Sequence, residues 1–183
     1  MSFDLDQFVL DLRRAAASDT AVRTICETIE AAIADPTAIR PALPTFDDDE
    51  ALLYEDDAIS IWHCVYHSGA TIPPRDHQMA AIIGLYVGRE QNDFYEADPA
   101  GGVRKSSEVF LETGKTLSIG PSAIHSVACI SEISCRGFHV YLGNLTETDR
   151  WLFDVDHRQK LRDIIPDMIG RIRRSMITET LTG

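Results

Sequence analysis

The chain has 183 residues, of which 44% are hydrophobic and 25% are charged, as expected for one soluble globular domain with a substantial core. Its formal net charge of -12 argues against nucleic acid or an anionic membrane surface as a partner, because both attract clustered Lys and Arg. The opening MSFDLDQFVL lacks a signal peptide's basic and apolar regions, and no stretch approaches the about 20 apolar residues of a membrane span.

The four cysteines, Cys26, Cys64, Cys129 and Cys135, show neither a CxxC spacing nor a dense framework. They are therefore expected to be reduced thiols in a cytoplasmic protein. Cys64 and Cys129 fall inside predicted strands, where we expect them to pack rather than to react.

Helical periodicity marks residues 3–34, with Ser18-Asp19 as a break and a cap. Its apolar positions are Phe3, Phe8, Leu12, Val22, Ile25, Ile29 and Ile33. A connector punctuated by prolines runs from Asp35 to Pro44, and the acidic run 46–50 that follows it is expected to be a solvated loop. We assign residues 1–45 to an N-terminal helical segment of a single domain that spans residues 1–183.

Residues 51–145 differ in character, because short β-branched and aromatic runs alternate there with turn signals. This spacing predicts an all-β sandwich or barrel. The runs are ISIWHCVYH, SGATIPPRD, QMAAIIGLYVG, REQNDFYEA, KTLSIG, PSAIHSVACI and GFHVYLGNL.

From Glu147 the pattern returns to helix, and we assign residues 147–180 to a C-terminal helical segment. An apolar stripe at spacings of three and four is expected to pack against the barrel or to form the seam of a homodimer. The stripe consists of Leu161, Ile164, Ile165, Met168, Ile169 and Ile172.

Polar residues that could form a site fall within the β region. After the turn at Pro73-Pro74, alternation along a strand predicts one face made of Arg75, His77, Met79, Ala81 and Ile83. Two large polar groups on an apolar face are typical of a barrel interior that holds a site. The alternative is a single histidine hydrogen-bonded at the rim of the barrel.

Two further motifs add histidines. Gly114-x6-Pro121-x3-His125 predicts a histidine at the mouth of a strand, although a surface histidine beside a turn has the same pattern. In Phe138-His139-Val140-Tyr141, His139 and Tyr141 face the same way, and a buried pair of this kind must satisfy two polar tips.

Together these motifs resemble the cysteine-dioxygenase-like proteins of the cupin superfamily. PPRDHQMAAIIGLYVGREQNDFY is similar to their first cupin motif, LSIGPSAIHSVACI to their second, and GFHVYLGNL to the later strand with a His-x-Tyr pair. The resemblance covers roughly residues 51–145. It implies a mainly β fold, a double-stranded β-helix (cupin or jelly-roll) barrel with N-terminal and C-terminal α-helices.

The resemblance also implies a mononuclear Fe(II) held by three histidines, with a thiol substrate and O₂ on its open side. His77 and His125 match two of the metal ligands. His139 and Tyr141 match the pair that assists catalysis, with Tyr141 offering its hydroxyl to the substrate or oxygen. The implied function is a metal-dependent oxygenase that acts on a small thiol or carboxylate.

Arg75 stands where the family has its first metal-binding histidine, and a protonated guanidinium cannot be a ligand. Three interpretations follow. A substitute such as His67 could complete a metal shell, or a metal-free cupin could bind an acidic small molecule through Arg75, or the cavity could be inert. His63 and His157 are expected to be ordinary satisfied or exposed histidines.

Overall fold

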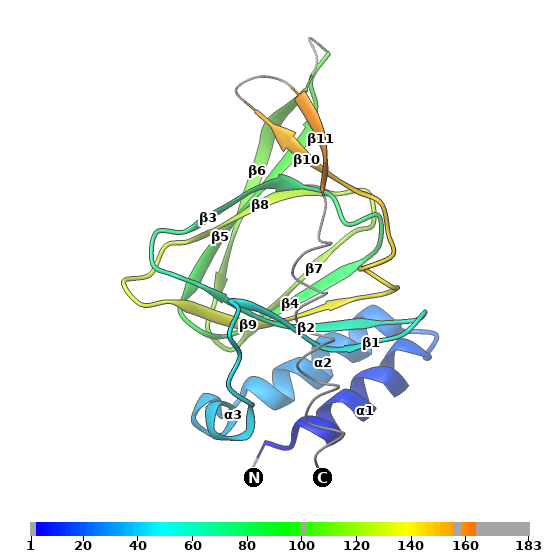
Figure 1. Ribbon diagram of the computed structural model, residues 1–183, viewed down its shortest axis with the longest axis vertical. Coiled ribbons are helices and arrows are strands. Elements are labelled where there is room, and N and C mark those ends of the chain that lie inside the picture. Colours follow the sequence, from blue (N-terminus) through cyan, green and yellow to red (C-terminus); the bar gives the residue numbers. More distant parts are fainter. Residues whose placement is uncertain (1–2, 100–101, 156–158, 164–183) are drawn as a thin grey trace.

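The computed structural model describes residues 3–99, 102–155 and 159–163 (Figure 1). Three helices come first: α1 (Leu5–Ala16), α2 (Ala21–Ile33) and α3 (Pro36–Ala42). The Asp4 carboxylate caps α1 by accepting a hydrogen bond from the Gln7 backbone N–H, and Asp35 caps α3 in the same way at Thr37. The two predicted helices within residues 3–34 are confirmed, whereas the predicted connector contains α3, which begins with a proline at a position that needs no N–H.

The remaining regular elements of the described residues are strands. They are β1 (Glu50–Glu55), β2 (Ser60–Tyr66), β3 (Thr71–Arg75), β4 (Ala81–Val87), β5 (Arg89–Ala97), β6 (Val103–Glu112), β7 (Lys115–Ile119), β8 (Ile124–Cys129), β9 (Cys135–Tyr141), β10 (Arg150–Asp154) and β11 (Gln159–Asp163). They form a five-stranded sheet in the order β1-β2-β9-β4-β7 and a six-stranded sheet in the order β11-β10-β3-β8-β5-β6.

The pairing of the eight strands from β2 to β9 identifies the fold. β2 pairs with β9, β3 with β8, β4 with β7 and β5 with β6, in each case antiparallel. The chain therefore follows the course of one long hairpin whose successive pairs alternate between the two sheets, which is the jelly-roll arrangement. The predicted double-stranded β-helix is confirmed by this topology.

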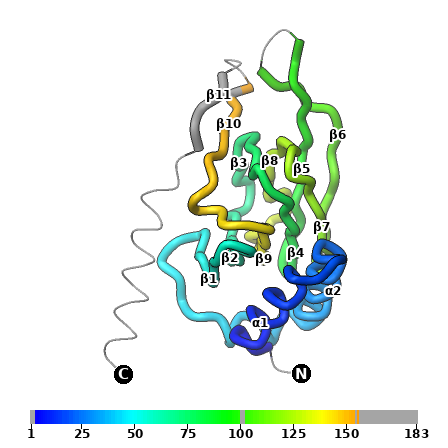
Figure 2. Tube along the Cα trace, turned by 90° about the vertical axis from the view of Figure 1, so that its right-hand side faces the viewer, coloured from blue at the N-terminus to red at the C-terminus, as the bar shows by residue number. Residues whose placement is uncertain are grey.

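Two apolar layers lie on opposite sides of the five-stranded sheet. The inner layer fills the space between the sheets and includes Trp62, Ile83 and Val127, whereas the outer layer joins the sheet to α1 and α2 and includes Leu12 and Phe138. Figure 2 shows both helices beneath this sheet, on the side away from β3 and β8.

A glycine permits the close contact between α2 and the five-stranded sheet. A Cβ at Gly84 of β4 would lie 2.1 Å from Ile29 Cγ2, so any larger residue would push the helix away. The outer layer therefore fixes the position of the five-stranded sheet, whose other face forms one wall of the interior.

Three local predictions were wrong. β1 and β6 were not among the predicted runs, and the predicted strand through His77 is interrupted, because residues 76–80 connect β3 to β4. Beyond Glu147 the described residues form β10 and β11 instead of a helix, since β10 pairs with both β3 and β11. Most of the predicted C-terminal stripe, as well as His157, lies outside the described residues. Within the described part of the chain, no helix is long and apolar enough to span a membrane.

Candidate functional site

His77 and His125 meet between the two sheets. Their Nε2 atoms are 2.9 Å apart, and the His77 ring lies 4.9 Å from the Tyr141 ring, measured between centroids. All three side chains are buried. The predicted proximity of the two histidines is confirmed, while their role as metal ligands remains a prediction.

A network around Asp76 holds the connector that carries His77. One carboxylate oxygen of Asp76 accepts a 2.8 Å hydrogen bond from the Trp151 backbone N–H, and the other accepts one of 2.6 Å from the Gln78 side chain. Gln78 has a φ of 57°, a left-handed conformation that turns the chain from β3 towards β4. The histidine is therefore held by contacts with β10 rather than by a strand of its own.

The hydrogen bonds around His125 indicate which nitrogens carry protons. His125 Nδ1 lies 3.2 Å from the side-chain oxygen of Asn92, to which it must donate. Nε2 of His125 is then an acceptor, so the neutral His77 donates from its own Nε2 and leaves Nδ1 as an unpaired acceptor. Burial, followed by the charge of Arg75, holds the pKa of both imidazoles well below their ordinary range, which keeps them neutral.

His139 and Tyr141 lie side by side on β9. The Tyr141 hydroxyl is 3.5 Å from His139 Nδ1, a long contact, and His139 Nε2 has no partner. Burial, and then the charge of Arg75, lowers the pKa of His139 to about 3. Burial raises the pKa of Tyr141 above its ordinary value, so its phenol stays protonated.

Arg75 ends β3 next to the histidine pair, because its Cα is paired with that of His125 across β3 and β8. Although burial acts to lower the pKa of Arg75, the neighbouring Tyr66, Tyr141 and Glu50 raise it above its ordinary value. The guanidinium is therefore a fixed positive charge in the interior, and its Nη1 has no hydrogen-bond partner.

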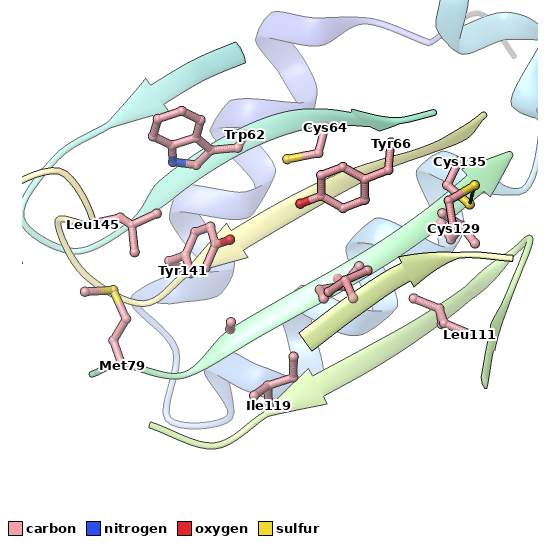
Figure 3. Close-up of a cluster of buried hydrophobic side chains, with 14 residues drawn as sticks. Trp62, Cys64, Tyr66, Met79, Leu111, Ile119, Cys129, Cys135, Tyr141 and Leu145 are labelled. Carbon is pink, nitrogen blue, oxygen red and sulfur yellow. Dashed lines mark hydrogen bonds between the residues drawn. The ribbon is translucent and has the colours of Figure 1, made fainter. Parts of the chain in front are cut away.

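A cavity of about 210 Å³ opens beside Arg75 between the sheets. Tyr141 lines it as well, so the cavity and the histidine pair have a wall in common. Figure 3 shows Trp62, Tyr66 and Tyr141 on the side of β2 and β9 that faces away from the helices. The full lining is Glu50, Trp62, Cys64, Ile72, Pro73, Arg75, Tyr141, Leu145, Arg150 and Leu152.

The interior also contains polar residues to which the sequence analysis gave no role. Trp62 Nε1 is a buried donor without a partner, and both Glu90 Oε2 and Asn92 Nδ2 are buried without a partner. Burial raises the pKa of Glu90 to about 7. The alternation of Trp62 with Cys64 and Tyr66 along β2 could have placed Trp62 on the interior face.

The donor set does not fit the three-histidine iron centre that the resemblance implies. His77 and His125 supply two imidazoles, but Arg75 occupies the third position and has neither a lone pair nor a neutral form. Across residues 3–99, 102–155 and 159–163, no three His, Cys, Asp or Glu side chains gather so that they could hold a metal ion.

His67 and His63 lie away from the histidine pair. Nε2 of the exposed His67 lies 3.2 Å from a carboxylate oxygen of Asp49, so the structure gives no support to its suggested part in a metal shell. His63 is buried on the helix side of the five-stranded sheet, where its Nε2 lies 2.7 Å from the Tyr86 hydroxyl. It is a satisfied core histidine, as predicted.

No protein-family model matches the chain, and no curated protein matches it. Among solved structures, an RmlC-like cupin from Methanocaldococcus jannaschii, described as a double-stranded β-helix, is 11% identical over 56% of this chain and 89% of that chain, with a TM-score of 0.46. Hydroquinone 1,2-dioxygenase from Sphingomonas with 4-hydroxybenzoate bound is 11% identical over 56% of this chain and 70% of that chain, with a TM-score of 0.43.

A third similar structure is peruvianin-I, a cysteine peptidase from Thevetia peruviana latex. It is 15% identical over 47% of this chain, with a TM-score of 0.40, and this chain covers 51% of its length. The similar structures thus include cupin-fold proteins and enzymes. At such identities no function is carried over, and the fold assignment rests on the order of the strands in the chain itself.

Proposed function

We propose that the protein binds a small carboxylate in the 210 Å³ cavity, with Arg75 and Trp62 as the groups that recognise it. The observation that carries the proposal is that Arg75 and Trp62 line this cavity from opposite sheets, and that each has a buried donor without a partner, Nη1 of Arg75 and Nε1 of Trp62. A buried N–H that finds no acceptor costs free energy, and the oxygens of an acidic ligand would supply the missing acceptors.

The charge of the cavity favours an anion. Its lining residues include two arginines, Arg75 and Arg150, and one carboxylate, Glu50. The Glu50 carboxylate already accepts a 3.1 Å hydrogen bond from the Tyr66 hydroxyl. A bound carboxylate would bring a further negative charge to the buried Arg75, whose guanidinium can bind it through two parallel hydrogen bonds.

The size of the cavity favours a small ligand. Its 210 Å³ is below the about 300–1,000 Å³ of sites for drug-sized molecules. The apolar part of the wall, Ile72, Leu145 and Leu152, suits a short aliphatic chain. Simple organic acids and thiol carboxylates such as cysteine or 3-mercaptopropionate meet both conditions.

The alternative function is a metal-dependent oxygenase of the cysteine-dioxygenase-like kind, and one distance favours it. Imidazole nitrogens bind such metals at about 2.0–2.1 Å, so two nitrogens that would hold one metal lie within about 4 Å of each other. The Nε2 atoms of His77 and His125 are 2.9 Å apart. Metal content after anaerobic loading with iron distinguishes the two functions, because the carboxylate-binding function needs no stoichiometric metal and the oxygenase does.

Calorimetric titration with acetate, pyruvate and 3-mercaptopropionate tests the proposal. We expect a carboxylate to bind, its uncharged amide to bind far more weakly, and saturation at 100 times Kd to stabilise the protein by about 2.7 kcal/mol. Arg75→Met should abolish binding, and Trp62→Phe should weaken it by about tenfold, the loss of one hydrogen bond to a charged group.

Arg104→Met is the matched control, because Arg104 is exposed and pairs with Glu96 far from any lining residue of the cavity. This variant should bind the carboxylate as wild type does. Equal affinities of wild type and Arg75→Met for every acid would rule out Arg75 as the recognition group.

A further inference from the structure

Cys129 and Cys135 form a buried thiol pair, and neither residue belongs to the proposed carboxylate site. Cys129 ends β8, Cys135 begins β9, and their Sγ atoms are 2.8 Å apart (Figure 3). Both side chains are buried, whereas residues 130–134 between them are exposed or half-buried at every position. A disulfide bond of about 2.05 Å would require the sulfurs to approach by only about 0.8 Å.

The surrounding backbone is shaped to seat this pair. Gly88 has a φ of 88°, and a Cβ there would lie 2.9 Å from Cys135 Sγ and equally close to Ser131 Oγ. The Ser131 hydroxyl lies 3.6 Å from Cys129 Sγ and 3.5 Å from Cys135 Sγ. A glycine and a serine thus hold the two sulfurs against each other, which simple core packing of two cysteines does not require.

The two thiols are not equivalent. Burial acts to raise the pKa of Cys129, but hydrogen bonds from the Cys135 thiol and the Ser131 hydroxyl outweigh it, and the pKa lies below its ordinary value. Burial, together with the contact to Cys129, raises the pKa of Cys135 to about 12. Cys129 is therefore the more acidic thiol of the pair and the one that would react first, and Cys135 is the thiol that would react second.

We propose that Cys129 and Cys135 are a reversible redox site that forms an intramolecular disulfide with a low-molecular-weight disulfide as the oxidant. The Cys129 thiolate attacks one sulfur of the oxidant, forms a mixed disulfide and releases one thiolate. Cys135 then loses its proton, attacks Cys129 Sγ and displaces the second thiolate. Two protein thiols and one disulfide thus become one protein disulfide and two small thiols.

The bond would tie the two sheets together at the crossover from β8 to β9. β8 belongs to the six-stranded sheet and carries His125, and β9 belongs to the five-stranded sheet and carries His139. Each cysteine is four positions from its histidine along the strand. The disulfide is independent of carboxylate binding, because neither cysteine lines the cavity beside Arg75.

The test is to treat the folded, fully reduced chain with oxidised glutathione. Free thiols should fall from four to two, the intact mass should fall by two hydrogen atoms without a glutathione adduct, and dithiothreitol should restore both values. Peptide mapping should find Cys129 joined to Cys135. Cys64→Ser, a buried control in the same apolar layer, should still form this disulfide.

Cys135→Ser should stop the reaction at the mixed disulfide on Cys129, because the second thiol is absent. Mapping of the wild-type product requires no variant, so the test does not depend on how well the serine variants fold. The proposal is overturned if the folded protein keeps all four thiols, if Cys26 or Cys64 takes part in the bond, or if oxidation occurs only in urea.

Discussion

The two faces of the five-stranded sheet bury residues in opposite ways. On the outer face, the helices and strands contribute an apolar layer, and the buried His63 on this face forms a hydrogen bond with the Tyr86 hydroxyl. On the inner face, apolar side chains alternate with charged and polar ones. The buried side-chain atoms that lack a partner among the described residues belong to Trp62, Arg75, His77, Glu90, Asn92 and His139.

Strand register places four of these six residues, Trp62, Glu90, Asn92 and His139, on the inner side. Trp62, His139 and Ile83 are cross-strand neighbours in the five-stranded sheet, while Glu90 pairs with Cys129 and Asn92 with Val127 in the other. Cross-strand neighbours share a face, and Ile83, Cys129 and Val127 all belong to the inner layer. Native proteins rarely leave buried polar atoms without a hydrogen-bond partner. The concentration of such atoms on the inner side therefore distinguishes it, as a candidate site, from the structural outer face.

The largest expected effect is on the outer face. Phe138 is fully buried against the rings of Phe3, Phe8 and Tyr86, so Phe138→Ala should lower the free energy of unfolding by about 3–5 kcal/mol. Urea unfolding followed by circular dichroism measures this loss, and carboxylate affinity should stay unchanged. The inner counterpart Arg75→Met should cost less than Phe138→Ala, because it changes the side-chain volume little and removes a buried charge together with its attraction to Glu50.

If Arg75→Met destabilised the protein as much as Phe138→Ala does, the two faces would have the same structural role. The guanidinium would then belong to the scaffold rather than to a binding site.

The pH dependence of the free energy of unfolding should show what the burial of Glu90 on the inner side costs. Glu90 in the native state keeps its proton up to about pH 7, whereas its ordinary pKa is 4.5. Between these values the native state binds more protons than the unfolded chain, so the free energy of unfolding contributed by Glu90 falls as the pH rises. The full difference is on the order of 3 kcal/mol.

Glu90→Gln isolates this contribution, because it leaves the titration of the buried histidines in place. The stability of the variant relative to wild type should rise from pH 4.5 to pH 8. A difference that is constant over this range would mean that Glu90 is ionised in the native protein throughout.

The sequence contained most of the information on the inner site's imidazoles and little on their surroundings. His125 and His139 could be predicted because each interrupts an apolar β pattern, and the motif resemblance placed His77 with them. The turn at residues 76–80 could not be predicted, because Asp76 is fixed by the backbone of Trp151, 75 residues further along the chain. No local pattern contains such a contact.

The cavity and the strands β10 and β11 could not be predicted for a related reason. Trp62 has an ordinary strand pattern, and its missing partner is a property of the space between two sheets. β10 is a strand because it pairs with β3, yet Leu161 in the neighbouring β11 also fits a helical stripe with residues that follow it. Pairing at long range, rather than local periodicity, decided the structure there.

Arg75→His should change the metal chemistry of the inner face. Because residue 75 is paired with His125 across the strands, a histidine there would add an imidazole beside the existing pair and remove a repelling charge. We expect Zn²⁺ to bind at least ten times more tightly than in wild type, or about 1.4 kcal/mol. A competition titration against a chromogenic chelator measures both affinities. Equal values would mean that the arginine does not oppose a cation at this position.

The smallest effect comes from a matched pair of tyrosines, one on each face. Tyr86→Phe removes the partner of His63, 2.7 Å away, and leaves a buried imidazole nitrogen unsatisfied, which should cost about 1–2 kcal/mol of unfolding free energy. Tyr141→Phe removes a hydroxyl whose nearest partner, His139 Nδ1, is at 3.5 Å, a distance at which a hydrogen bond contributes little. It should therefore cost less than about 0.5 kcal/mol.

Both variants lose the same atom from a buried ring, so urea unfolding compares the two environments directly. If Tyr141→Phe lost as much free energy of unfolding as Tyr86→Phe, the Tyr141 hydroxyl would be hydrogen-bonded as strongly as the Tyr86 hydroxyl. Fewer polar groups on the inner face would then lack a partner than the distances indicate.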